Sequence, residues 1–315
     1  MISTLDSQKI TAPVDIAIFI KSYSADFRNV ARLLNSIADF NRDGMPIYLC
    51  VPDDEISLVQ KFGDICDVTV VPESFFTVDF PTEKIHGRTL GYLRQQIIKL
   101  SVHQIQAAKH YVILDSDAVL IRPFYKADFL NEAGINYTVL VEDLDQFVAP
   151  WYRSYADRRK KALSDIATRI GLPTSHLRTC HGNVTFSAEV LQALESWCRT
   201  EGLSPSNLME IGPYEFSWYN FFLQWYLPER VIPIEPFIRY VHVRNEFRAM
   251  RYQGVTLEDL KRGYVGICLN SNWSQNQDEK YFRQLERKSM GFRLRQVRDL
   301  LERIYSGVKR RIRWR

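Results

Sequence analysis

Short apolar segments alternate with amphipathic ones along the first part of this chain, and that alternation limits the folds it can adopt. Residues 14–20 predict a β-strand, and residues 25–40 carry apolar side chains at helical spacing. The same order returns as a strand over 47–51, a helix over 53–62 and a strand over 68–71. A βαβαβ order builds a parallel sheet through right-handed crossovers. The sequence therefore predicts an α/β fold, Rossmann-type, with a mostly parallel central sheet flanked by helices.

A further strand is predicted where the apolar run 111–114 stops at Asp115 and Asp117. Such sheets bind ligands just beyond the carboxyl ends of their strands. In an extended backbone the side chains of residues i and i+2 point to one side, so both carboxylates can face one cation. The alternative is a solvated turn in which an aspartate caps the next segment. Apolar residues resume at 118–121, and two carboxylates beside a core need a cation or a proton, which favours a binding site.

This stretch, followed by Arg-Pro-Phe at 122–124, resembles the Asp-x-Asp region of glycosyltransferases with the GT-A fold, in particular bacterial enzymes of the polysaccharide and lipopolysaccharide type. Upstream, 95–100 is similar to a Gln-Gln-x-x-Lys-Leu helix of some of these families. Downstream, 181–187 resembles their Asn/Gly-rich acceptor strand and 215–223 a Glu-bearing helix. The likeness covers roughly residues 14–245. It implies a metal-dependent hexosyltransferase that moves a sugar from a nucleotide-diphosphate donor, expected to be a UDP-sugar, to a polysaccharide or lipid-linked glycan acceptor.

The donor site is expected at the first turn of the fold and on the helix predicted over 89–108. The turn offers an aromatic ring, hydroxyl groups and a carboxylate, and the resemblance implies that it holds the nucleoside; Asp26 or Ser24 can instead simply cap the helix. On the helix, a lysine near the aspartates would balance a diphosphate. The residues expected to bind the donor are Ser22, Tyr23, Asp26, Arg88, Gln95, Gln96, Lys99, Asp115 and Ser116.

The expected metal is Mn²⁺ or Mg²⁺, held by Asp115, Asp117 and His242, the last of which can equally be a core histidine. A second acidic cluster at 142–145, after a strand predicted over 137–141, competes for the ion but has no apolar segment directly after it.

Sugar transfer with inversion needs a carboxylate that takes the acceptor proton while a metal stabilises the leaving diphosphate. Glu215 is the candidate base, with Glu210 as its substitute, and Asp117 completes the expected catalytic pair. Contacts with the acceptor are expected from Trp151, His181, Gly182 and Asn183.

Several protein classes are disfavoured by the composition. The five cysteines are scattered without Cys-x-x-Cys spacing, which argues against a zinc site and a disulfide framework. No Gly-x-Gly-x-x-Gly follows the first strand, so a dinucleotide-binding enzyme is disfavoured. No run approaches the roughly 18 apolar residues that cross a bilayer, and residues 1–12 show no signal-peptide core. We therefore expect a cytoplasmic protein.

The net charge of +4 is unevenly distributed, because residues 283–315 hold twelve Lys and Arg against three acids. Apolar residues recur there every three or four positions, which predicts a basic amphipathic helix. Such a helix suits an anionic membrane surface, although docking on the domain is an open alternative for 283–305. We expect a catalytic domain over 1–282 and a tail over 283–315 that holds the protein at the inner face of the cell membrane. No nucleic-acid recognition motif accompanies the charge.

Two other functions stay open from the sequence. One is a membrane-peripheral scaffold that binds a nucleotide sugar without chemistry. The other is a sugar-phosphate nucleotidyltransferase, although the Gly-rich, Lys/Arg-containing first turn expected of that class is absent.

Overall fold

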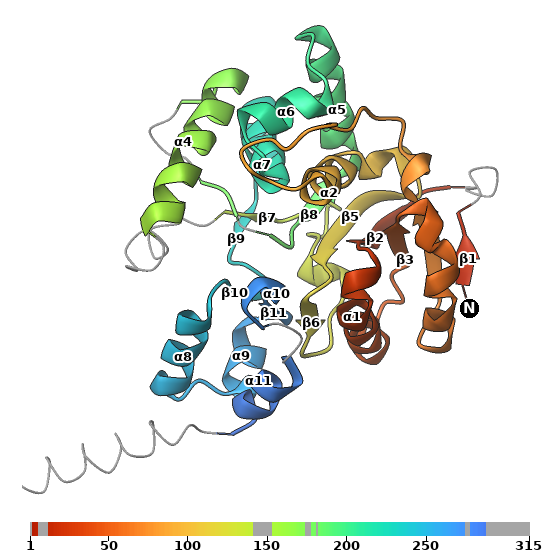
Figure 1. Ribbon diagram of the computed structural model, residues 1–315, viewed down its shortest axis with the longest axis vertical. Helices are drawn as coiled ribbons and strands as arrows, with labels where there is room; N and C mark the ends of the chain where they lie inside the picture. The colour runs from red at the N-terminus through yellow and green to blue at the C-terminus, as the bar shows by residue number, and fades with distance from the viewer. Residues whose placement is uncertain are drawn as a thin grey trace, which may run out of the picture.

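A six-stranded sheet forms the centre of the computed structural model, which describes residues 2–5, 12–140, 153–173, 178–180, 182–274 and 278–287. Its spatial order is β1, β4, β3, β2, β5, β8. All neighbouring strands are parallel except β5 and β8. The strands are β1 (Ile2–Thr4), β2 (Val14–Lys21), β3 (Ile47–Val51), β4 (Val68–Pro72), β5 (Ala108–Asp115) and β8 (Thr185–Ser187). The predicted α/β fold with a mostly parallel sheet is confirmed (Figure 1).

The helices of this first part pack on the sheet because each presents an apolar stripe. In α1 (Phe27–Phe40) the buried side chains include Val30, Leu33, Leu34 and Ile37, which recur at helical spacing. The other helices are α2 (Leu90–Leu100), α4 (Arg153–Ile170), α5 (Ala188–Thr200), α6 (Pro205–Ile211) and α7 (Glu215–Tyr226). Figure 1 shows α4, α5, α6 and α7 gathered at the top of the view.

A second, three-stranded sheet lies beside the first and has its own hydrophobic core. In it β11 (Gly266–Leu269) pairs parallel with β10 (Ile238–Val241) and antiparallel with β6 (Ala118–Leu120). Because β6 follows β5 after two residues, the chain passes from one sheet to the other at Ser116 and Asp117. The helices of this part are α8 (Arg244–Gln253), α9 (Leu257–Gly263), α10 (Ser271–Ser274) and α11 (Asp278–Leu285). The strands β7 (Thr138–Val139) and β9 (Pro233–Ile234) pair parallel in a separate two-stranded sheet.

Three predicted elements differ from the structure. The helix expected over 89–108 ends at Leu100, because Gln106 adopts a left-handed conformation and Ala108 already pairs with Val14 in the sheet. The helix expected over 53–62 is a 3₁₀-helix over Asp53–Asp64. The strand expected over 137–141 is only the two-residue β7 within the described residues.

Some predictions fall where the structure describes nothing. The acidic cluster at 142–145, Trp151, His181 and residues 288–315 lie outside the described residues. The expected division between 282 and 283 falls within α11, whose Leu285 is fully buried in the second core. Within the described part of the chain, no helix combines the length and the apolar character that crossing a membrane requires.

Candidate functional site

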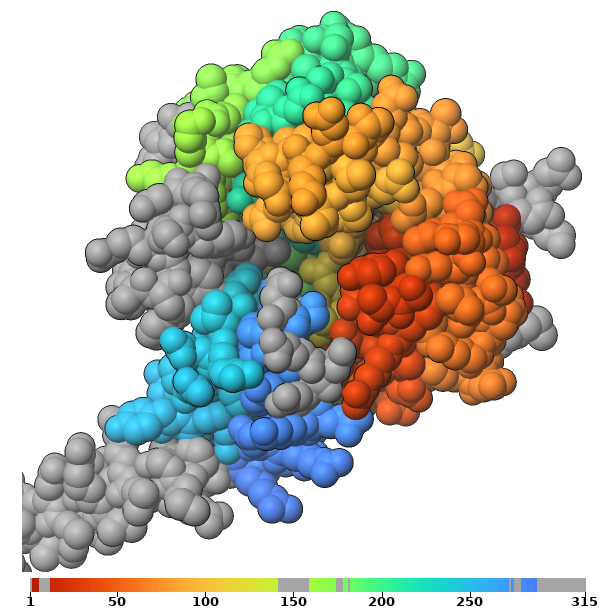
Figure 2. Space-filling model, viewed as in Figure 1, coloured from red at the N-terminus to blue at the C-terminus, as the bar shows by residue number. Residues whose placement is uncertain are grey.

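A polar cavity of about 420 Å³ opens at the carboxyl ends of the central strands. Asp115 is the last residue of β5 and pairs with Lys21, the last residue of β2, so both strands end at this edge. The cavity gathers most of the side chains predicted from the sequence. These are Asp26, Arg88, Gln95, Gln96, Lys99, Asp115, Ser116, Asp117, Glu215 and His242. Figure 2 shows a hollow in this face between the region of α2 and the blue C-terminal elements.

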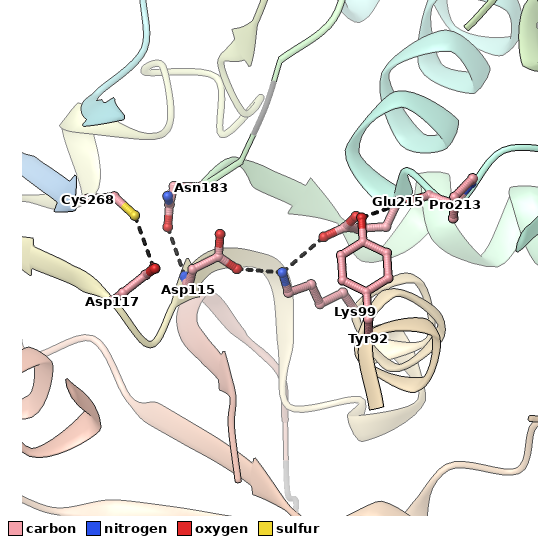
Figure 3. Close-up of polar contacts among 8 residues, drawn as sticks. All are labelled: Tyr92, Lys99, Asp115, Asp117, Asn183, Pro213, Glu215 and Cys268. Atoms are coloured by element: carbon pink, nitrogen blue, oxygen red, sulfur yellow. Dashed lines mark hydrogen bonds and ion pairs between the residues drawn. The ribbon is translucent and has the colours of Figure 1, made fainter. Parts of the chain in front are cut away.

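A buried lysine links two carboxylates in this cavity. Lys99 Nζ donates to Asp115 Oδ1 at 2.6 Å and to Glu215 Oε1 at 2.9 Å (Figure 3). Lys99 is on the last turn of α2, and Glu215 is the first residue of α7. The relative exposure of Lys99 is 1% and that of Glu215 is 3%, so solvent screens this triad little. The ammonium group also lies 4.8 Å from the centre of the Phe216 ring.

One cation serves two carboxylates, and this sets the ionisation of the triad. Burial of Lys99 disfavours its charge, but Asp115 and Glu215 outweigh that effect and raise its pKa. Burial raises the pKa of Glu215, the charge of Lys99 opposes that shift, and the charge of Asp115 adds to it. The amide of Gln96, itself buried, adjoins Glu215 and donates to its carboxylate when the amide nitrogen faces it. The carboxylate of Glu215 is thus fixed in position by Lys99, and its burial favours the protonated form.

Asp117 points away from Asp115, toward the second sheet (Figure 3). Its Oδ1 accepts a hydrogen bond from Cys268 Sγ at 3.0 Å, and its Oδ2 accepts one from the backbone N–H of Ser271 at 2.9 Å. Burial, with the charge of Asp115 added, raises the pKa of Asp117 to about 6. The expectation that both carboxylates face one side is therefore wrong, because Ser116 and Asp117 form a turn and not a continued strand.

His242, the third expected metal ligand, stacks on Tyr240 with the ring centres 4.3 Å apart. Burial and the nearby charges of Arg159 and Arg239 lower its pKa to about 3, so the ring is neutral. Among the described residues, no three His, Cys, Asp or Glu side chains are grouped closely enough to hold a metal ion. The predicted ligands thus line one cavity without forming a preformed metal cage. Carboxylates remain suitable ligands for an ion whose other ligands are phosphate oxygens, which is how Mg²⁺ is commonly bound.

The expected nucleoside contacts divide into two groups. Asp26 lines the cavity; burial raises its pKa, and a hydrogen bond with Ser116 opposes that shift. Ser22 and Tyr23 are not among the residues that line the cavity. Ser22 is buried, and its backbone N–H donates to Cys50 O at 3.0 Å, whereas Tyr23 is half exposed. The segment after β2 therefore brings Asp26 to the cavity, whereas Ser22 and Tyr23 do not line it.

Gly182 and Asn183 support Asp115 from behind. Asn183 Oδ1 accepts a hydrogen bond from the backbone N–H of Asp115 at 2.9 Å, and the residue is almost fully buried with a φ of 53°. A Cβ atom on Gly182 would lie 3.2 Å from Asp115 Oδ2 and 3.2 Å from Tyr240 Cε2. Neither residue lines the cavity, so their expected contact with an acceptor stays a prediction.

The sequence did not single out several residues of the cavity. Arg159 of α4 is 2% exposed, donates to Cys180 O at 2.9 Å and lies with its guanidinium 5.7 Å from the Tyr214 ring centre. It belongs to a run of basic residues, 158–161, in which nothing distinguishes the buried member. Tyr240 and Ser271 also line the cavity, and Cys268 contacts Asp117 without lining it. The pairing of β6 with β11 brings this region to Asp117, and local sequence does not reveal that pairing.

Comparison with known proteins gives little beyond the fold. Residues 7–153 match a family described as "Family of unknown function (DUF6492)". No curated protein matches the chain. Among solved structures, a bifunctional glycosyltransferase described as WbbM in its apo form is similar with a TM-score of 0.49 and 11% sequence identity. The similarity covers 91% of this chain and 52% of the other, so the chain spans about half the length of that protein.

Proposed function

We propose that this protein is a glycosyltransferase that takes a sugar from a nucleotide-diphosphate donor. The observation that carries the proposal is the buried Asp115–Lys99–Glu215 triad in a polar cavity at the carboxyl ends of β2 and β5. Open α/β sheets bind ligands at this edge. Lys99 and Glu215 are buried and Asp115 is partly exposed to the cavity, and burying such charges is costly, which favours a functional over a structural role.

The donor site is supported by the charges around the cavity. Arg88 and Arg159 of its wall can pair with a diphosphate, and the carboxylates on the same wall suit a cation that is bound together with it. Asp26 and Ser116 lie at the first-turn side of the cavity, where a carboxylate and a hydroxyl can bind ribose hydroxyl groups. A UDP-sugar is the donor that we propose.

Glu215 serves as the base in this proposal. The acceptor oxygen attacks the anomeric carbon, a new C–O bond forms, and the bond to the β-phosphate oxygen breaks with its electron pair left on the diphosphate. The acceptor proton passes to Glu215, whose pKa is raised by burial, which favours proton uptake. Lys99 holds the carboxylate in place during this step, and Gln96 adjoins it. When a Mn²⁺ or Mg²⁺ ion is bound beside Asp115 and Asp117, it supplies stabilisation of the leaving diphosphate.

The experiment is release of nucleoside diphosphate from a panel of nucleotide sugars, with and without Mn²⁺, by the wild type, Glu215→Gln and Glu210→Gln. Glu210 is the matched control, since it lies in the last turn of α6 and does not line the cavity. We expect Glu215→Gln to lower turnover at least about a hundredfold while donor binding persists, and Glu210→Gln to behave as the wild type. Donor binding without turnover in the wild type would leave only a non-catalytic scaffold. The absence of both donor binding and turnover would refute the proposal.

The polysaccharide or lipid-linked acceptor and the place of action are part of the same proposal. The charge of residues 283–315 supports attachment to an anionic membrane surface from the cytoplasm. Flotation with vesicles rich in anionic lipid, at low and high salt, tests this. We expect flotation that high salt abolishes; equal flotation with neutral vesicles would count against it.

A further inference from the structure

A second cavity of about 460 Å³ adjoins the first and shares Arg88 and Tyr214 with it. It lies between the turn at 85–88 and the helices α4 and α6. Helix α4 also contacts α7, and α6 also contacts α2. Its other lining residues are His86, Gly87, Lys161, Ala162, Asp165, Ile211 and Pro213. The two cavities are therefore neighbouring parts of one binding surface, with the Tyr214 ring and Arg88 at their boundary.

The turn that carries Arg88 is fixed by its backbone. His86 and Gly87 both have positive φ, 50° and 71°, and the Arg88 N–H donates to Ile85 O at 2.9 Å. Positive φ at both central residues defines a tight turn of the I′ type. His86 Nε2 donates to Glu210 O at 2.6 Å, which fastens the turn to the end of α6. The Arg88 guanidinium lies 4.8 Å from the Tyr92 ring centre. Arg88 is thus presented at the boundary from a rigid support.

The second cavity has the composition of a subsite for a charged sugar. Tyr214 offers an aromatic face, and sugar rings pack their apolar faces on such rings. Arg88 and Lys161 carry positive charge, and among the described residues of this wall Asp165 is the one acid, at 3.2 Å from Lys161. The described part of the wall therefore carries more basic than acidic side chains, even with that ion pair formed.

We propose that this second cavity binds the acceptor through an anionic group, a sugar carboxylate or a phosphate, next to the unit whose hydroxyl reacts at Glu215. This inference rests on the proposed sugar transfer, because only that reaction makes the bound saccharide an acceptor. The binding of an anionic saccharide is testable without any turnover. Arg88 reaches both cavities, so it lies between the donor diphosphate and the acceptor anion. Lys161 lines the second cavity and not the first. A substitution at Lys161 can therefore distinguish acceptor binding from donor binding.

The test uses the full chain, with Lys161→Glu and Lys160→Glu as a matched pair. Lys160 is the exposed neighbour on the same helix and lines neither cavity. Binding of trigalacturonate, glucose 1-phosphate and neutral maltotriose is measured by calorimetry, and cleavage of the donor is measured without acceptor.

We expect the wild type to bind at least one anionic probe more tightly than maltotriose. Lys161→Glu should weaken that binding about threefold to fivefold, as for an exposed charge pair, while Lys160→Glu changes it less than twofold. The preferred probe distinguishes a carboxylate from a phosphate. No preference for an anion, or equal losses in both variants, would overturn the inference. Absence of donor cleavage in the wild type would instead refute the proposed function and leave the binding result standing.

Discussion

Replacement of Lys99 by methionine tests the buried triad most sharply. The substitution keeps the apolar part of the side chain but removes the ammonium group that lies 2.6 Å from Asp115 and 2.9 Å from Glu215. Asp115 and Glu215 then lose the cation that they share. Glu215 is only 3% exposed, so water cannot replace it there. Breaking a buried ion pair by removal of one partner costs about 3–5 kcal/mol. We expect a loss of this size in the free energy of unfolding at pH 8.

The pH dependence of that loss follows from Glu215. Burial already raises its pKa above the unfolded value, and removal of Lys99 raises the folded-state pKa further. A carboxyl group with a raised folded-state pKa is stabilising while protonated, and that stability is lost as the pH rises through this pKa. Lys99→Met should therefore lose more stability at pH 8 than at pH 5. Glu215→Gln added to it should restore about 2 kcal/mol at pH 8, because the buried charge is gone.

The assay is urea unfolding followed by tryptophan fluorescence, to which the fully buried Trp218 contributes. The wild type, Lys99→Met, Glu215→Gln and the double variant are compared at pH 5 and pH 8. A loss below about 1 kcal/mol in Lys99→Met, or a loss that does not change with pH, would refute the electrostatic account of the triad.

Three further predictions concern Asp117, Gly182 and the metal. Burial raises the pKa of Asp117 to about 6, so its charge destabilises the folded protein above that pH. Asp117→Asn should therefore raise the free energy of unfolding by up to about 3 kcal/mol at pH 8, with no gain at pH 4. Urea unfolding at both values checks this, and a less stable variant at pH 8 would contradict it. Gly182→Ala places a methyl group 3.2 Å from Asp115 Oδ2, so donor turnover should fall several-fold while the melting temperature moves by only a few degrees; unchanged turnover would show that the loop tolerates the shift. Calorimetry should find weak Mn²⁺ binding to the protein alone and at least tenfold tighter binding with UDP present, because the described residues form no cage of three ligands. Equally tight binding in both cases would mean a complete protein site.

The sequence predicted most of the central sheet and the edge at which the cavity opens, because both follow from local patterns. Uninterrupted apolar runs marked β2, β3 and β5, and the acids after β5 marked its carboxyl end. Lys99 and Glu215 were singled out separately, and the structure brings them together.

The orientation of individual side chains was beyond such patterns. Asp117 turns away from Asp115 because the chain leaves one sheet for another between them, and that depends on the pairing of β6 with β11, residues about 150 positions apart in the chain. The burial of Arg159 depends on the packing of α4 against α7, and the early end of the helix at Leu100 depends on the pairing of Ala108 with β2. Contacts distant in sequence decided each of these outcomes.

The most direct measurement of the central claim is a crystal structure of the protein soaked with a UDP-sugar and Mn²⁺. We predict density in the cavity at the ends of β2 and β5, with the ribose near Asp26, the diphosphate beside Arg88 and Lys99, and the anomeric carbon within reach of Glu215. Density only in the cavity at the opposite ends of these strands, lined by Asp15 and His103, or none at concentrations that saturate binding, would contradict it.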